Sequence, residues 1–129
     1  MKHFTIFSLL CINLLFISIS AEAQQVKFHR ISTAKAYKMI SELQDYVILD
    51  VRTESEYRKK HIPEAVWIPF REINDRAEKE IPDKNVPIFV HCRNGGRSTN
   101  AARNLVKLGY KNVYDFRSIR RWPGEMTGS

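Results

Sequence analysis

One short segment of this sequence holds the residues best suited to chemistry. It reads His91-Cys92-Arg93-Asn94-Gly95-Gly96-Arg97-Ser98, directly after the apolar residues 87–90 and directly before a pattern typical of a helix. Two adjacent glycines allow the backbone to turn its N–H groups inward, and the helix N-terminus that follows adds a partial positive charge. The segment is therefore predicted to form a cradle for an anion, with Cys92 at its mouth.

Cys92 is predicted to act as a nucleophile. Inward-facing N–H groups, a helix N-terminus and neighbouring guanidinium groups all favour the thiolate, the form in which a cysteine reacts. The alternative is a structural thiol, since an unpaired cysteine is most often a small, buried hydrophobe. Arg97 is expected either to hold the loop or to receive an oxyanion with two N–H groups, whereas Arg93 either contributes its field or is a solvated surface charge.

The rest of the chain is suited to one small domain that positions this segment. With 129 residues, 43% of them hydrophobic and 27% charged, the chain is long enough for one core and too short for two. Short apolar runs predict strands buried on both faces, and apolar residues at helical spacing predict helices between them. The predicted strands are 26–31, 46–49, 65–68, 86–90 and 113–116, and the predicted helices start at Ser32 or Thr33 and span 54–60, 73–80 and 98–108, where Gly109 ends the last one.

Strands and helices thus alternate along the chain. This order predicts an α/β fold with a central parallel sheet of about five strands, flanked by helices on both faces. Ligands of such sheets bind at the carboxyl ends of the strands, which is where Cys92 is expected. His91 precedes Cys92 on the same strand, so its side chain should point to the opposite face and serve packing.

The N-terminal segment 1–23 has the pattern of a secretory signal peptide. A basic start precedes an uncharged apolar run, and Ala21 and Ala23 have the spacing of a cleavage site. We expect cleavage between Ala23 and Gln24, a mature domain spanning 24–129, and a location that is periplasmic or secreted. The alternative is an uncleaved anchor, because the apolar run approaches the length that spans a bilayer.

The formal net charge is +7, but the basic residues are scattered among acidic ones instead of forming a block. Nucleic-acid binding is therefore not expected, whereas attraction of small anionic substrates fits the charge. His29, His61, His91 and Cys92 do not form a ligand pair with zinc spacing. We expect no metal ion and no cofactor.

Three stretches of the sequence resemble the rhodanese-like family. The segment from Cys92 to Arg97 is similar to the family's active loop, in which a cysteine is followed by four residues and an arginine. Residues 50–57 together with 61–65 resemble the signature of its first half. Gly109-Tyr110 with Val113-Tyr114 resembles the stretch after its active helix. The resemblance covers nearly all of the chain after position 23.

The resemblance implies a rhodanese-like fold and a thiosulfate-type sulfurtransferase. Cys92 is then the group that takes the outer sulfur of a small anionic donor such as thiosulfate, holds it as a persulfide and passes it to a thiol or cyanide acceptor. The substrate-side candidates are the loop residues Arg93, Asn94, Gly95, Gly96, Arg97 and Ser98. Asp50 and Arg52 are implied as support residues, the alternative being an ion pair that fixes the end of a strand. We expect a monomer that has no contact with a membrane once the signal segment is removed.

Two other functions stay open. One is a noncatalytic module that carries a persulfide or binds a protein partner. The other is a cysteine-dependent phosphatase or arsenate reductase, because related folds use a cysteine and an arginine on a similar cradle. Loops of that type have five residues between the two, whereas four separate Cys92 from Arg97.

The chain departs from the family pattern at two places. The family commonly has glycine on both sides of its His-Ile-Pro element, where this chain has Lys60 and Glu64, and it often has two glycines where this chain has Arg117 and Ser118. We expect the first pair to change only the conformation of a turn. The second is expected to bring the Arg117 charge to the rim of the pocket, so that Arg117→Gly alters the apparent affinity for thiosulfate.

Overall fold

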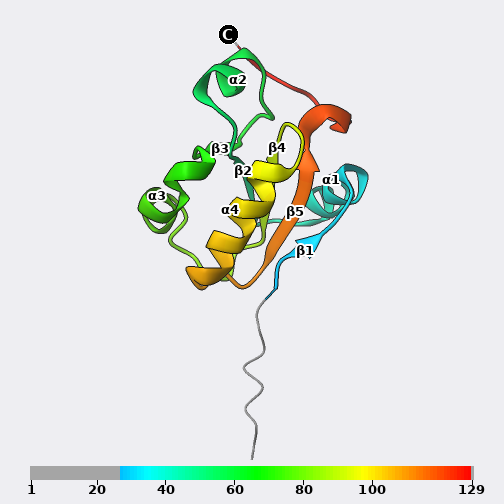
Figure 1. Ribbon diagram of the computed structural model, residues 1–129. Helices are drawn as coiled ribbons and strands as arrows, with labels where there is room; N and C mark the ends of the chain where they lie inside the picture. Colours follow the sequence, from blue (N-terminus) through cyan, green and yellow to red (C-terminus); the bar gives the residue numbers. More distant parts are fainter. Residues whose placement is uncertain (1–26, 129) are drawn as a thin grey trace, which may run out of the picture.

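The computed structural model of the protein describes residues 27–128, which form a five-stranded sheet with helices on both sides (Figure 1). The strands are β1 (His29–Arg30), β2 (Val47–Asp50), β3 (Val66–Trp67), β4 (Ile88–Cys92) and β5 (Val113–Ser118). All neighbouring strands pair in parallel, in the order β1-β5-β4-β2-β3. The predicted parallel α/β sheet is confirmed.

The predicted signal segment 1–23 and its cleavage point lie outside the described residues. Between residues 27 and 128, no helix is long and apolar enough to cross a membrane.

Four α-helices connect the strands of the described chain, together with two short 3-10 helices. They are α1 (Thr33–Glu42), α2 (Glu54–Lys59), α3 (Ile73–Glu80), α4 (Gly96–Lys107), η1 (Phe70–Glu72) and η2 (Ile119–Arg121). Side-chain caps explain where two of them begin. The Ser32 hydroxyl accepts the Lys35 N–H at 3.1 Å before α1, and Thr53 and Glu56 form a reciprocal capping box at α2.

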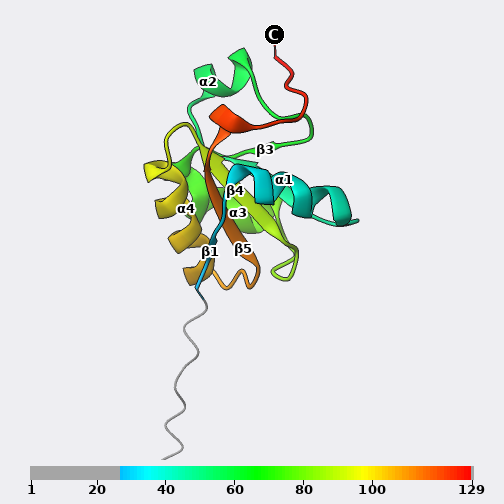
Figure 2. The same ribbon diagram turned by 90° about the vertical axis from the view of Figure 1, so that its right-hand side faces the viewer.

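The helices cover the sheet in two layers that have separate cores. The core under α3 and α4 includes Leu49, Val90 and Leu105, and the core under α1 includes Ile40 and Phe89. Figure 2 shows α4 and α1 on opposite sides of the sheet, and α2 lies beyond the carboxyl ends of the strands. This arrangement leaves the carboxyl end of β4 between three helical segments.

Compared with the prediction, β1 and β3 are shorter, β5 is longer, and β4 has the same length but is shifted by two residues. β1 is limited to His29 and Arg30 because it lies at the edge of the sheet and pairs only with β5. β4 continues past its apolar run to Cys92, since both its neighbours extend far enough to pair with it. All five residues of β4 are buried, as expected for the central strand.

An irregularity in β5 shapes the end of the sheet next to Cys92. Val90 pairs with Asp115, but His91 pairs with Arg117, so Phe116 is an extra residue on β5. Such bulges bend a strand and redirect its side chains. Here the bulge brings Arg117 and Ser118 alongside His91 and Cys92.

Candidate active site

Cys92 is the last residue of β4, and its side chain faces a loop that leads into α4. It is a free thiol with an exposed fraction of only 1%. The backbone N–H of Gly95 donates a hydrogen bond to the Cys92 Sγ at 3.0 Å. An N–H donor aimed at sulfur stabilises negative charge there, as the predicted cradle requires.

The two loop glycines have different structural roles. Gly95 has a φ of 108°, in the left-handed region, and is the N-cap of α4. A Cβ atom at Gly95 would lie 2.6 Å from the Arg117 Nε, whereas a Cβ atom at Gly96 would meet no atom within 4 Å. The turn of the loop therefore depends on Gly95, and Gly96 is simply the first residue of the helix.

Hydroxyl groups hold the carbonyl oxygens of the loop. The Ser118 hydroxyl donates to the Arg93 carbonyl at 2.7 Å, and the Ser98 hydroxyl donates to the Gly95 carbonyl at 3.1 Å. Ser98 is fully buried, so it supports the loop from beneath. These hydrogen bonds fix the loop backbone in the conformation in which the Gly95 N–H faces the sulfur.

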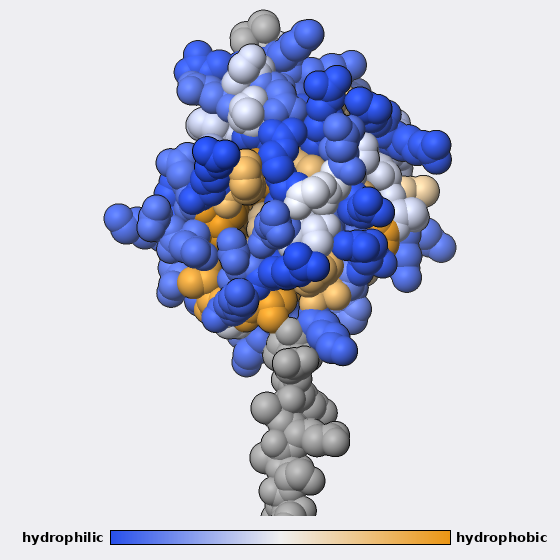
Figure 3. Space-filling view, in the orientation of Figure 1, coloured by the Kyte–Doolittle hydropathy of each residue, from blue (hydrophilic) through white to orange (hydrophobic). Residues whose placement is uncertain are grey.

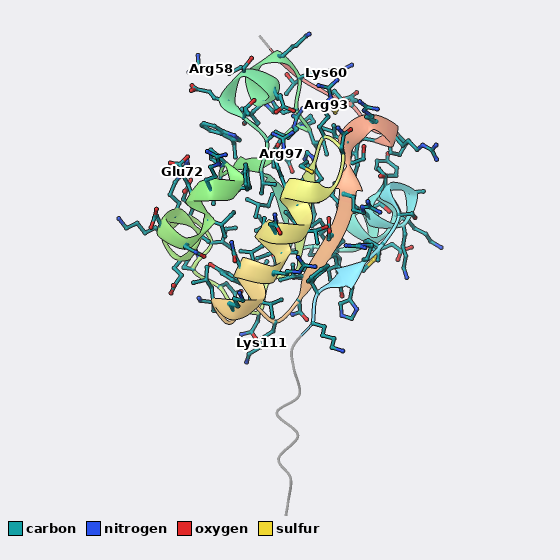
Figure 4. All side chains as sticks on the ribbon, in the orientation of Figure 1. Arg58, Lys60, Glu72, Arg93, Arg97 and Lys111 are labelled. Atoms are coloured by element: carbon teal, nitrogen blue, oxygen red, sulfur yellow. The ribbon has the colours of Figure 1, made fainter. Side chains whose placement is uncertain are left out.

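Arg97 binds a carboxylate of α2. Its two terminal nitrogens donate to the two oxygens of Glu56, at 2.7 and 3.0 Å. The hydrogen bonds from Arg97 lower the pKa of Glu56 from 4.5 to about 2. In Figure 4, Arg97 points from the start of α4 toward α2. Of the two expected roles, the structure shows Arg97 holding the loop region to α2.

Arg97 also acts on the thiol electrostatically. Its pKa is raised first by the hydrogen bond to Glu56, and a coulombic interaction with Cys92 is among the smaller causes. The guanidinium group is therefore close enough to stabilise a thiolate without contacting it.

Asp50 and Arg52 form a buried ion pair at the end of β2. Arg52 donates from Nε and Nη2 to the Asp50 carboxylate at distances of 2.7 to 3.1 Å, and Nη2 also donates to the Lys60 carbonyl at 2.7 Å. The Asp50 carboxylate further accepts the Arg52 backbone N–H at 3.0 Å. The pair fixes the strand end and the segment after α2, which is the alternative left open by the sequence.

His91 packs away from Cys92, as predicted. Its fully buried ring lies 5.1 Å from the ring of Phe116, in the core beneath α1. Its Nε2 has no hydrogen-bond partner and lies 3.8 Å from an oxygen of Asp50. Burial lowers the pKa of His91, so the imidazole is neutral at physiological pH.

Two basic pockets border the loop, and we name them after the helices beside them. The α2 pocket has a volume of about 600 Å³ and is lined by Arg52, Ser55, Glu56, Lys59, Lys60, Arg93, Ile119 and Arg120. The α1 pocket has a volume of about 590 Å³ and is lined by Arg30, Ile31, Ser32, Thr33, Ala34, Asn94, Phe116, Arg117, Ser118 and Arg121. Arg93 lines one pocket and Asn94 the other, so the loop that follows Cys92 contributes to both.

The sequence did not point to most of these basic residues. Arg93 lies between the loop and Lys60 (Figure 4), and hydrophilic side chains cover most of this end of the molecule (Figure 3). Lys59 and Arg120 are 61 positions apart, and no local pattern predicts that they line the same pocket.

Within the described chain, no group of three or more His, Cys, Asp or Glu residues could hold a metal ion.

The departures from the family pattern affect backbone conformation in different ways. Glu64 and Arg117 both have a left-handed φ, of 68° and 67°. This conformation is strained for a residue with a Cβ and is easily adopted by glycine. Lys60 has a φ of −165°, which any residue adopts.

A buried cysteine ends the central strand, faces a backbone N–H and precedes a loop that borders two basic pockets, an arrangement suited to chemistry between a thiol and small anions. The comparison with protein families names the class further. The family described as Rhodanese-like domain matches residues 32–121, and the chain belongs to this family.

Curated relatives carry names from sulfur chemistry. The thiosulfate sulfurtransferase GlpE of Coxiella burnetii is 33% identical over 87 residues, which cover 67% of this chain and 78% of the relative. The thiosulfate sulfurtransferase PspE of Escherichia coli is 35% identical over 65 residues, covering 50% and 62%. A candidate sulfur carrier protein of Bacillus subtilis, YrkF, is 42% identical over 79 residues, covering 60% and 42%. These relatives support sulfur transfer as the class of activity.

Solved structures confirm the fold. A rhodanese with anions from Escherichia coli superposes with a TM-score of 0.62 at 27% identity, covering 65% of this chain and 99% of that chain. The Alr3790 protein from Anabaena has a TM-score of 0.69 at 23% identity, covering 76% and 91%. The predicted rhodanese-like fold is therefore correct.

Proposed function

We propose that this protein moves sulfane sulfur from a thiosulfate-like donor, through a persulfide on Cys92, to a thiol or cyanide acceptor. The observation that carries the proposal is the 3.0 Å hydrogen bond from the Gly95 N–H to the Cys92 Sγ. The same donor stabilises a thiolate before the transfer and a persulfide anion after it.

The reaction has two steps. The Cys92 thiolate attacks the outer sulfur of thiosulfate, the S–S bond of the donor breaks, and sulfite leaves with the bonding electron pair. An acceptor thiolate or cyanide then attacks the outer sulfur of the persulfide. The bond between that sulfur and Sγ breaks, its electron pair returns to Sγ, and the Cys92 thiolate is regenerated.

We assign the donor to the α2 pocket. Its basic residues Arg93, Lys59 and Lys60 attract a dianion, and apart from Ile119 its lining is polar or charged. Gly95 and Ser98 shape the cradle, whereas Arg97 positions it by holding Glu56. Asp50 and Arg52 support the strand end on which Cys92 depends.

The phosphatase reading is disfavoured by the loop. Four residues separate Cys92 from Arg97, and the fork of Arg97 is bound to Glu56 and not directed at an oxyanion site. A noncatalytic persulfide carrier is the second candidate, favoured by the 42% identity to YrkF.

We further propose that the protein is exported through segment 1–23, is periplasmic or secreted, and acts as a monomer. The pattern of a basic start, an apolar run and Ala21 and Ala23 supports export.

The test is intact mass spectrometry of the protein expressed from its full gene in a bacterial host. Before any reaction, the mass shows whether the chain begins at Met1 or at Gln24. Thiosulfate is then added after reduction of the thiol, with Cys92→Ser as control, and cyanide is added last. We expect a gain of one sulfur atom that requires Cys92 and is discharged as thiocyanate.

The other outcomes separate the candidates. A gain of sulfur without discharge to any thiol or to cyanide would favour a carrier. Absence of a gain on fully reduced protein would refute thiosulfate as donor.

A further inference from the structure

The two pockets beside the active loop differ in chemistry. Five basic residues line the α2 pocket together with Ser55, Ile119 and the carboxylate of Glu56. The α1 pocket combines three arginines with an apolar surface formed by Ile31, Ala34 and Phe116. Its volume of about 590 Å³ falls in the range of sites for small organic ligands. The α1 pocket, whose lining contains no carboxylate, thus combines arginines with apolar side chains, and this combination suits an organic anion.

Its three arginines come from different elements. Arg30 lies on β1, Arg117 near the end of β5, and Arg121 in η2. Among residues 27–128, none of the three forms a salt bridge, and Arg30 donates only to the Thr99 hydroxyl, at 3.2 Å. Three guanidinium groups without a carboxylate partner are available to an anionic ligand.

Arg117 is held in place at the expense of backbone strain. Its φ is 67°, and its backbone N–H donates to the fully buried Asp115 at 2.9 Å. Its side chain covers Gly95, since a Cβ atom there would lie 2.6 Å from the Arg117 Nε. Strain of this kind persists where the surrounding structure enforces it, often at functional sites. An anion at Arg117 is thus next to the residue that donates to the Cys92 sulfur.

We propose that the α1 pocket binds the sulfur acceptor, and that this acceptor is a small organic thiol carrying carboxylates. The proposal rests on the persulfide chemistry described above. Carboxylates bind to Arg30, Arg117 and Arg121, and the carbon skeleton lies on the apolar surface. The acceptor thiolate attacks the outer sulfur of the Cys92 persulfide, and the Sγ–S bond breaks. The electron pair of that bond remains on Sγ, which regenerates the Cys92 thiolate, and the acceptor leaves as a persulfide.

This assignment changes the expected role of Arg117. Arg117 lines the α1 pocket and is not among the residues of the α2 pocket, so we assign its direct contact to the acceptor and not to thiosulfate. Arg117→Gln should therefore slow discharge of the persulfide more than its formation.

The first experiment measures single-turnover discharge of the persulfide in the full chain. Mercaptosuccinate is the probe, and 2-mercaptoethanol, which lacks carboxylates, is the control at equal thiolate concentration. We expect Arg30→Gln, Arg117→Gln and Arg121→Gln each to slow discharge by mercaptosuccinate about five- to tenfold, since one charge-assisted contact is worth up to a factor of ten. Discharge by 2-mercaptoethanol should not change. Arg103→Gln, an exposed arginine of α4 outside both pockets, is the matched control variant.

Several outcomes would overturn the proposal. Equal effects of the variants on both thiols, or no effect on either, would show that these arginines do not bind the carboxylates of the acceptor. Slower persulfide formation from thiosulfate in Arg117→Gln, with normal discharge, would assign the α1 pocket to the donor.

A second experiment does not depend on sulfur transfer. Binding of succinate, which has the carboxylates but no thiol, is followed by NMR on the unloaded protein. We expect shifts at Arg30, Arg117 and Arg121, and about a tenfold weaker affinity in Arg117→Gln but not in Arg103→Gln. If the wild type forms no persulfide but binds succinate in this way, the proposed function fails and the pocket stands. If it forms a persulfide but succinate does not bind, the pocket assignment fails alone.

Discussion

At the scale of single residues, Gly95 and Gly96 are adjacent but have different conformational requirements. Gly95→Ala places a Cβ atom on a backbone with a φ of 108° and against Arg117. We expect a loss of about 1 to 2 kcal/mol in the free energy of unfolding. The rate of persulfide formation should also fall, because the N–H that faces the sulfur is displaced. Urea unfolding and single-turnover mass spectrometry measure the two effects.

Gly96→Ala is the matched control for this prediction. A Cβ atom at Gly96 meets nothing within 4 Å, and the residue lies in the first turn of α4. We expect unchanged sulfur transfer and a stability that is equal or up to about 1 kcal/mol higher, because alanine favours the helix. Similar losses in both variants would show that the cradle does not depend on the conformation of Gly95.

His91 is expected to make stability depend on pH. Burial lowers its pKa below the ordinary value of 6.5, so the unfolded chain binds this proton more readily than the native protein. His91 therefore reduces stability as the pH falls below 6.5, by at most about 1.4 kcal/mol per pH unit, until the pH reaches the pKa of the folded state. His91→Phe keeps an aromatic ring against Phe116 and removes this contribution. Urea unfolding at pH 7.5 and 5.5 should show a smaller loss in the variant, and an equal loss would contradict the neutral buried imidazole.

At the scale of elements, the pair of Glu56 and Arg97 joins α2 to α4. Glu56 also accepts hydrogen bonds from the Thr53 N–H and hydroxyl, at 3.3 and 3.0 Å, so one carboxylate caps α2 and binds α4. The short helix α2 has no buried residue of its own. This carboxylate therefore helps to hold α2 against α4, together with the stacking of Tyr57 on Trp67 and the Arg52 contact to the Lys60 carbonyl.

Glu56→Gln should lower the free energy of unfolding by about 1 to 2 kcal/mol at pH 7. The pKa of Glu56 is lowered from 4.5 to about 2, so its contribution is complete above pH 4.5 and is lost as the pH falls toward 2. The difference between wild type and variant should shrink over this interval, as measured by thermal unfolding at several pH values.

Glu54→Gln is the control, because the pair of Glu54 and Arg58 lies on the exposed side of the same helix at 2.7 Å. Exposed pairs of this kind contribute little, and we expect a change below about 0.5 kcal/mol. An equally large effect in both variants would mean that the charge of α2, and not its link to α4, determines stability.

At the scale of the whole molecule, the positive charge is predicted to steer anionic donors. The net charge is +7, and both pockets beside Cys92 contain several basic residues. Raising the salt concentration from about 20 mM to about 300 mM reduces the screening length from roughly 20 Å to roughly 6 Å. We expect kcat/KM for dianionic thiosulfate to fall several-fold.

Methanethiosulfonate, a donor with a single negative charge, provides the control for this measurement. The logarithm of kcat/KM for this donor should fall with salt concentration about half as steeply as that for thiosulfate, because the attraction scales with the charge of the ligand. Identical dependences for the two donors would exclude steering by the field of the protein.

Much of the fold was predictable because its signals are local. A strand buried on both faces needs a continuous apolar run, and residues 86–90 contain one that became the buried central strand β4. Gly109 ends α4 with a φ of 95°, a conformation that glycine adopts without strain. The position of Cys92 between β4 and α4 was predictable because both of these elements have such local signals.

The partners of the site residues were decided by the tertiary structure alone. Arg97 binds Glu56, which lies 41 positions earlier, and Arg117 covers Gly95 because a bulge redirects the end of β5. Arg30 and Arg121 share a pocket although 91 positions separate them. Local patterns report burial and backbone preference, which each segment carries by itself, whereas these contacts depend on the order of strands in the sheet and on the register between them.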